Sequence, residues 1–304
     1  MFSGVSEDGL AALLLADFLQ DRISIPVSVN QSDTLPKWVN KHTLVFSINY
    51  DGDREETINT FKQAIQKHCK IIGITSNGHL KKYCEHRNLP LVTLPQGFPS
   101  RFTIGFLFFT SLFSLQKTGL LQINIDSDIK ETKTVLEEMK KKMSPSVPIK
   151  ENTAKQLAIQ IQQRTPLIFG WNIFSPVAKR WTMQCNQNAK LISHYYPIPE
   201  SMYYALVGWA NQTQDTQQYT SILFRDNQLE TKEMKKRLQF IERFYSDVTD
   251  ELTTVNPTGK SILAKLFSLL YLGDFTSVYT ALSNDVNPSS TPILHQLDEE
   301  LTRL

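Results

Sequence analysis

The sequence predicts an α/β protein built from two similar halves, each a doubly wound parallel sheet flanked by helices. Short β-branched runs alternate with amphipathic stretches over residues 1–121, and the same alternation restarts at residue 152. Prolines in the segment SPSVP separate the two parts. Strands that alternate with helices indicate βαβ units and therefore parallel sheets. A chain of 304 residues is long enough for two domains of ordinary size.

The first predicted domain covers residues 1–121 and begins at a partial strand. The run TLVFSIN is almost continuously apolar, which is typical of a central strand covered on both faces. Further strands are expected from the β-branched runs, and helices from the apolar periodicity between them. The expected strands are residues 25–30, 43–49, 70–75 and 91–95, and the expected helices are residues 10–20, 55–68 and 79–86.

The longest apolar stretch, residues 102–115, predicts a buried helix. It is shorter than the ~20 residues that a membrane-spanning helix needs, so no membrane association is expected. A helix that is apolar on all sides packs on several sides, for example between domains or subunits. The stretch therefore predicts an oligomer.

The connection between the domains is expected at residues 122–151, as a charged surface helix followed by the Pro-bearing linker. The second predicted domain covers residues 152–304. Its expected helices are residues 152–163, 176–188, 231–245 and 261–272, and its expected strands are residues 165–170, 219–224 and 252–255.

Composition excludes several functional classes. Thirty-two basic against thirty acidic side chains leave a formal charge of +2, without the basic excess of a nucleic-acid binder. Three cysteines without a CxxC pair argue against a disulfide framework and a structural zinc site. With no secretory signal at the N-terminus, a cytoplasmic protein is expected. No dinucleotide fingerprint, Walker loop or HExxH motif is present, so we expect neither cofactor nor metal.

Candidate ligand loops follow the predicted strands of the first domain. In open parallel sheets, ligands bind beyond the carboxyl ends of the strands, often against a helix N-terminus. The loops at these ends are residues 4–9, 50–57 and 76–78. The second has a glycine for a tight turn and then an acidic first helical turn.

Several segments resemble successive blocks of the sugar isomerase (SIS) domains of bifunctional phosphoglucose/phosphomannose isomerases. In the first half they are FSGVSEDG, LVFSINYDGDREET, IGITSNGHL and FPSRFTIGF. Downstream, VAKRWTMQCNQNAK, IPESMYYALVGW, ILFRD and LFSLLYLGDFTSVYTAL follow in the family's order. The resemblance implies two SIS domains, a homodimer, and metal-free interconversion of aldose and ketose 6-phosphates.

The resemblance also implies that two catalytic positions are substituted. Aldose–ketose isomerisation moves a proton between C1 and C2, which requires a carboxylate base close to both carbons. Gln187 stands where the family has this glutamate, and Tyr203 stands where it has a ring-opening histidine. Glutamine has no basic lone pair for a carbon-bound proton, and tyrosine, with a reference pKa of ~10, suits neutral proton transfer poorly. Glu200 and His194 are the alternative catalytic candidates.

The family's phosphate loop, S-Y-S-G-N-T, reads N-Y-D-G-D-R here. The new carboxylates repel a phosphate dianion, and Glu7 and Asp8 add negative charge at the same rim. Asp51 or Asp53 is expected to cap the next helix instead. By resemblance the substrate-binding candidates are Asn49, Asp51, Arg54, Ser76 and Arg101, the last two unchanged from the family. The family's C-terminal lysine is absent.

Two functions stay open at this level. The first is a sugar-phosphate isomerase in which Glu200 or His194 replaces the usual groups. The second is a non-catalytic protein that binds a sugar or sugar phosphate, as a regulator or sensor. Resemblance favours the first and the substituted residues favour the second.

Overall fold

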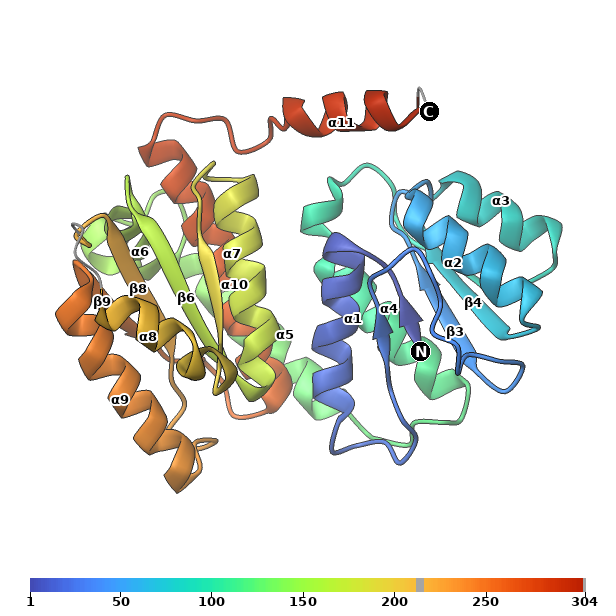
Figure 1. Ribbon diagram of the computed structural model, residues 1–304, viewed down its shortest axis with the longest axis horizontal. Helices are drawn as coiled ribbons and strands as arrows, with labels where there is room; N and C mark the ends of the chain where they lie inside the picture. The colour runs from blue at the N-terminus through green and yellow to red at the C-terminus, as the bar shows by residue number, and fades with distance from the viewer. Residues whose placement is uncertain (212–215, 303–304) are drawn as a thin grey trace. The chain divides into compact units, whose positions relative to one another are not determined.

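The computed structural model describes residues 1–211 and 216–302, and the chain divides into two compact units, Met1–Asn124 and Ile125–Leu304. Each unit contains one parallel sheet flanked by helices (Figure 1). This confirms the predicted α/β class with two doubly wound sheets.

The sheet of the first unit has the strand order β2-β1-β3-β4-β5, and all its pairings are parallel. Its strands are β1 (Phe2–Ser3), β2 (Val29–Asn30), β3 (Leu44–Ile48), β4 (Lys70–Thr75) and β5 (Leu91–Thr93). Its helices are α1 (Ser6–Leu19), α2 (Glu55–Gln66), α3 (Gly78–His86) and α4 (Ile104–Lys117). Helices α1 and α4 pack on one face, and α2 and α3 cover the other (Figure 1).

Amphipathic periodicity explains how α2 covers the sheet. Ile58, Phe61 and Ala64 recur at helical spacing and join Val45 of β3 and Leu80 of α3 in one buried cluster. Burying a side chain such as Phe61 contributes about 1.5–3 kcal/mol. This packing holds the start of α2, and therefore the loop before it, against the carboxyl ends of β3 and β4.

Helix α4 confirms the expected apolar helix but is buried along only one side. Leu107, Phe108 and Leu112 are buried, whereas Phe106 and Phe113 remain 37% and 42% exposed. The exposed aromatic side is the face that the homodimer prediction requires. The dimer itself stays a prediction.

The sheet of the second unit has the order β7-β6-β8-β9, again with parallel pairings. Its strands are β6 (Thr165–Trp171), β7 (His194–Ile198), β8 (Tyr219–Phe224) and β9 (Glu251–Val255). Its helices are α5 (Asp126–Lys142), α6 (Thr153–Ile161), α7 (Ser175–Gln187), α8 (Ala205–Ala210), α9 (Lys232–Val248), α10 (Ile262–Ser283) and α11 (Pro292–Thr302). Helix α5 packs against α10 within this unit.

Helix α10 is longer than the expected helix, which ended at residue 272. It continues through Gly273, where a Cβ atom would overlap the indole ring of Trp181 on α7. The indole Nε1 donates to the carbonyl of Leu269 at 2.9 Å, so the glycine permits close packing of α7 on α10. By length and composition α10 could also cross a membrane, but 67% of its apolar window is buried inside the protein, as in a core helix.

Candidate functional site

The strand order puts the topological switch point of the first sheet at the carboxyl ends of β1 and β3, and we call the region around these loop ends the crevice. The chain winds from β1 to β2 on one side and then returns to β3 on the other, so the winding direction changes between β1 and β3. Ligands of doubly wound sheets bind at such a switch point. The loops at residues 4–5 and 49–54 meet there, beside the loop at residues 76–77.

The loop between β3 and α2 is closed by its own side chain. Asn49 is fully buried, and its Oδ1 accepts a hydrogen bond from the backbone N–H of Gly52 at 3.0 Å. Its Nδ2 donates to the carbonyl of Arg54 at 3.4 Å. Gly52 has φ = +84°, and a Cβ there would overlap the carbonyl oxygen of Asn77. The amide of Gly52, a donor expected to face a phosphate, is therefore engaged within the loop.

Two buried carboxyl groups lie beneath Arg54. Glu7 and Asp8 occupy the first turn of α1, where the helix dipole favours negative charge. Arg54 Nη2 lies 3.7 Å from Glu7 Oε2, and its Nε lies 4.0 Å from Asp8 Oδ2. Asp8 Oδ1 accepts from the backbone N–H of Tyr50 at 3.2 Å. Burial raises the pKa of Asp8 to about 8, although Arg54 acts in the opposite direction.

The prediction that Asp51 or Asp53 caps α2 is wrong. Arg54 stands at the N-cap of α2, and no side chain accepts a capping hydrogen bond there. Asp53 instead accepts from the backbone N–H of His79 at 2.8 Å, and so satisfies a donor at the start of α3. Asp51 is exposed, yet partial burial of its carboxyl group still raises its pKa.

The structure brings four of the five predicted binding residues to this crevice. Asn49, Asp51 and Arg54 belong to the loop after β3, and the Ser76 hydroxyl donates to the carbonyl of Tyr50 in the same loop at 2.7 Å. Arg101 lies in a short 3-10 turn before α4, is buried, and places its guanidinium 5.1 Å from the ring centre of Phe102.

The catalytic candidates lie at opposite ends of the parallel strands of the second sheet. Helix α7 follows β6 and returns to the start of β7, so its last residue, Gln187, is at the amino ends of the strands, as is His194, the first residue of β7. Glu200 and Tyr203 belong to a 3-10 turn after β7, at the carboxyl ends of the strands. A five-residue strand separates them, about 17 Å at ~3.3 Å per residue. Tyr203 is 77% exposed.

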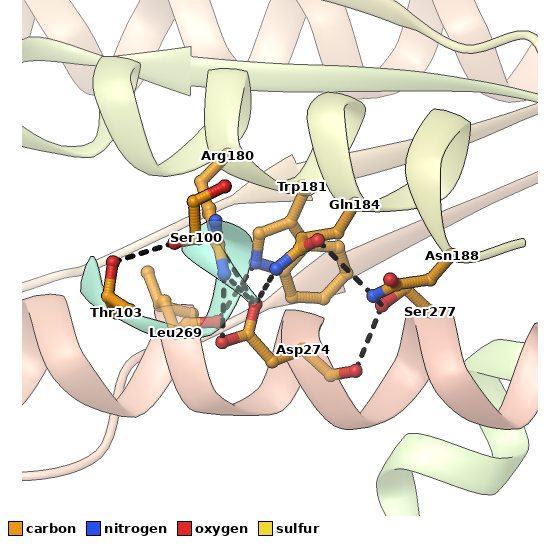
Figure 2. A network of polar contacts seen from close by, with 9 residues as sticks. All are labelled: Ser100, Thr103, Arg180, Trp181, Gln184, Asn188, Leu269, Asp274 and Ser277. Atoms are coloured by element: carbon orange, nitrogen blue, oxygen red, sulfur yellow. Dashed lines mark hydrogen bonds and ion pairs between the residues drawn. The ribbon is translucent and has the colours of Figure 1, made fainter. Parts of the chain in front are cut away.

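A polar network missed by the sequence analysis supports the end of α7 (Figure 2). Arg180 is fully buried and pairs with Asp274 of α10 at 3.1 Å. Gln184 donates to the same carboxylate at 2.9 Å, and Asn188 donates to Gln184 Oε1 and to the Ser277 hydroxyl. The spacing 180, 184, 188 on one helix face is the signal that could have revealed it.

Another feature that the sequence analysis missed, this one without any sequence signal, is the contact between Asp53 and His79. Their side chains meet at 2.6 Å, between Oδ1 and Nδ1. Only the adjacency of β3 and β4 brings their two loops together. Among the side chains that the structure describes, no group of three or more from His, Cys, Asp or Glu is placed to hold a metal.

Two doubly wound parallel sheets in one chain match the architecture of proteins with two sugar isomerase (SIS) domains. The family model described as "Bacterial phospho-glucose isomerase C-terminal SIS domain" matches residues 150–301. A solved structure from Thermus thermophilus, titled a glucose-6-phosphate isomerase like protein, shares the fold. Its TM-score is 0.66 at 20% identity, and the similarity covers 96% of this chain and 86% of that one.

Two curated relatives indicate which family of SIS proteins this chain is similar to. A protein of Caldicellulosiruptor bescii named bifunctional phosphoglucose/phosphomannose isomerase is 31% identical over 95% of this chain and 85% of its own length. A protein of the same name from Aquifex aeolicus is 26% identical over 100% of this chain and 90% of its length. The chain belongs to the bifunctional phosphoglucose/phosphomannose isomerase family, which confirms the resemblance read from the sequence.

Proposed function

We propose that this chain binds a sugar or sugar derivative in the crevice of the first unit and has lost the isomerase turnover of its family. The observation that carries the proposal is the hydrogen bond from the Gly52 amide to Asn49 Oδ1 at 3.0 Å. It closes the loop in which a 6-phosphate group would otherwise accept hydrogen bonds from backbone amides.

Electrostatics around this loop also disfavour a phosphate. At an effective dielectric of 20, two unit charges about 4 Å apart interact by about 4 kcal/mol, whereas a helix N-terminus contributes only about 0.3–2 kcal/mol. Asp51 and Asp53 place carboxyl groups in the loop itself. Arg54, the cation that could offset them, lies over Glu7 and Asp8. An uncharged hydroxyl group fits this environment better than a phosphate dianion.

The second unit supports the loss of isomerisation. Gln187, at the position that the resemblance assigns to the base, is half-buried at the end of α7 and has no proton-accepting lone pair suited to a C–H bond. Tyr203 lies at the opposite end of the strands. Neither residue supplies the carboxylate or imidazole that the family reaction uses.

A retained isomerase is the second candidate. The observation that favours it is the position of His194. This residue begins β7, is exposed to solvent, and is at the same end of the strands as Gln187. Histidine is a residue type that serves as a general base in catalysis. Glu200 is exposed at the other end of the strands, beside Tyr203.

One set of measurements separates the two candidates. Thermal unfolding is followed with glucose, mannose, glucosamine and their 6-phosphates, and formation of glucose 6-phosphate from fructose 6-phosphate is followed in a coupled assay. The proposal expects an unphosphorylated sugar to raise the unfolding temperature, and turnover at least 10²-fold below the usual enzymatic range of about 1–10³ per second. Turnover within that range, abolished by His194→Gln or Glu200→Gln, would establish the second candidate.

A further inference from the structure

The loop between β4 and α3 carries Asn77 followed by Gly78, the one Asn–Gly pair in the sequence. In such a pair the backbone nitrogen of the second residue can attack the side-chain amide of the first, because glycine has no Cβ to shield its nitrogen. A fold suppresses this reaction when it engages the two groups or holds them apart. The conformation of this loop therefore decides whether they react.

In the described part of the chain, nothing hydrogen-bonds either reacting group. Asn77 stands at the N-cap of α3, yet its side chain makes no capping hydrogen bond. Asp53 takes that role instead and accepts from the backbone N–H of His79 at 2.8 Å. No described group accepts from the N–H of Gly78, the first residue of the helix. Asn77 is also exposed, so water and hydroxide reach its amide.

The backbone of Asn77 turns the Gly78 nitrogen toward the side chain. Asn77 has ψ = −151°. Substituents of the tetrahedral Cα are offset by about 120° in projection, so this ψ leaves the Gly78 nitrogen only about 30° from eclipsing Cβ. In α-helices and β-strands the same angle is about 80–125°. Attack of the nitrogen on Cγ closes a five-membered ring, and a nearly eclipsed arrangement is what that ring requires.

Two contacts hold Asn77 in this conformation. The hydroxyl of Thr75, which is fully buried, donates to the Asn77 carbonyl at 2.8 Å and accepts from its N–H at 3.3 Å. Gly52, at φ = +84°, packs so closely on the same carbonyl that a Cβ there would overlap it. The reactive conformation is thus fixed by the contact between the loops after β3 and β4.

We propose that Asn77 deamidates spontaneously in the folded protein and that this modification alters the crevice as the protein ages. The Gly78 nitrogen gives its proton to hydroxide and attacks Cγ. The bond from Cγ to the side-chain nitrogen then breaks, and this nitrogen takes a proton from water and leaves as ammonia. Water opens the resulting cyclic imide at one of its two carbonyl carbons. Opening at Cγ gives aspartate, and opening at the main-chain carbon gives isoaspartate. One water is consumed and one ammonia released, without any oxidant or reductant.

The two products affect the crevice differently. Aspartate leaves the main chain unchanged and adds a negative charge at the N-terminus of α3, where the helix dipole favours it. In isoaspartate the main chain runs through the former side chain and gains one CH₂ group. The carbonyl that Thr75 and Gly52 hold becomes a free carboxylate. A closely packed contact does not absorb such a change without loss, so the isoaspartate form should unfold at a lower temperature.

The test incubates the full chain under native conditions and, in parallel, unfolded in guanidinium chloride. Peptides are then mapped by mass spectrometry, with a fragmentation method that distinguishes aspartate from isoaspartate. Asn77 should convert at least as fast in the folded protein as in the unfolded chain. The internal control is Asn88, which is also exposed but precedes Leu89, whose amide donates to the Cys84 carbonyl at 2.9 Å. Asn88 should stay unconverted in the folded protein. Slower conversion of Asn77 in the folded protein than in the unfolded chain would overturn the proposal.

Two sets of variants separate the geometry of the loop from its sequence. Thr75→Val removes the hydroxyl that holds Asn77 and should slow conversion in the folded protein alone, whereas Thr75→Ser, the matched control, keeps the hydroxyl and should match wild type. Equal folded-state rates for Thr75→Val and wild type would contradict the geometric argument. Asn77→Gln would need a six-membered ring, so it should form no product and keep its unfolding temperature during incubation. If wild type accumulates isoaspartate and also keeps its unfolding temperature, the proposed change of the crevice is wrong. The comparison of folded with unfolded wild type holds even if a variant fails to fold.

Discussion

Replacing Asp8 by asparagine should stabilise the protein at neutral pH and much less in acid. Burial raises the pKa of Asp8 from its usual value of 3.8 to about 8. Between these values the folded state keeps a proton that the unfolded chain has released, so wild-type stability falls as pH rises through this window. In this window the free energy of unfolding of the wild type falls by about 1.4 kcal/mol per pH unit. Asparagine carries no such proton, and its side-chain oxygen can still accept from the Tyr50 amide.

The expected gain follows from this slope. From pH 5 to pH 7 the stability of the variant relative to wild type should rise by about 3 kcal/mol. For a unit of this size that corresponds to a shift of roughly 10 °C in the unfolding temperature. Scanning calorimetry at pH 5, 6, 7 and 8 measures it, with Asp21→Asn, an exposed carboxyl in the turn after α1, as the control. A difference between Asp8→Asn and wild type that does not change with pH would refute the assignment of a buried, protonated Asp8.

Three further predictions concern function and assembly. The double change Gln187→Glu with Tyr203→His should raise fructose 6-phosphate turnover from its low level to a measurable trace in the coupled assay; robust turnover by the unmodified chain would contradict the placement of the base. Asp51→Ser with Asp53→Asn should increase the affinity for sugar 6-phosphates in titration calorimetry, and phosphate held by the loop of the unmodified protein in a soaked crystal would argue against this. The exposed aromatic side of α4 predicts a homodimer, and sedimentation that finds only a ~35 kDa species at micromolar concentration would exclude it.

Elements with a continuous apolar run or strong helical periodicity could be located from the sequence. TLVFSIN becomes β3, residues 70–75 become β4, and the periodic stretch after residue 54 becomes α2. Strand β7 was not expected, because HYYPI mixes a histidine, two half-buried tyrosines and a proline. It forms a strand through its parallel pairing with β6. An edge strand needs few apolar residues, so its pattern is weak.

The chemical groups that this chain possesses can be read from its residues alone. The absence of a glutamate at residue 187, the carboxyl groups of the loop after β3 and the order of the family blocks are all properties of the residues in line. Family membership follows from the same information, because related chains keep these blocks in the same order.

Which of these groups meet depends on the folded arrangement of the strands and loops. Asp53 caps α3 instead of α2, and Arg54 lies over the buried carboxyl groups of Glu7 and Asp8. Gln187 and Tyr203 lie at opposite ends of the strands of the second sheet. Parallel strands bring the loops at their carboxyl ends together regardless of sequence separation. Each helix then runs back, so that its last residues lie at the amino ends of the strands. Partners of a loop side chain are thus set by strand order, which no local pattern encodes.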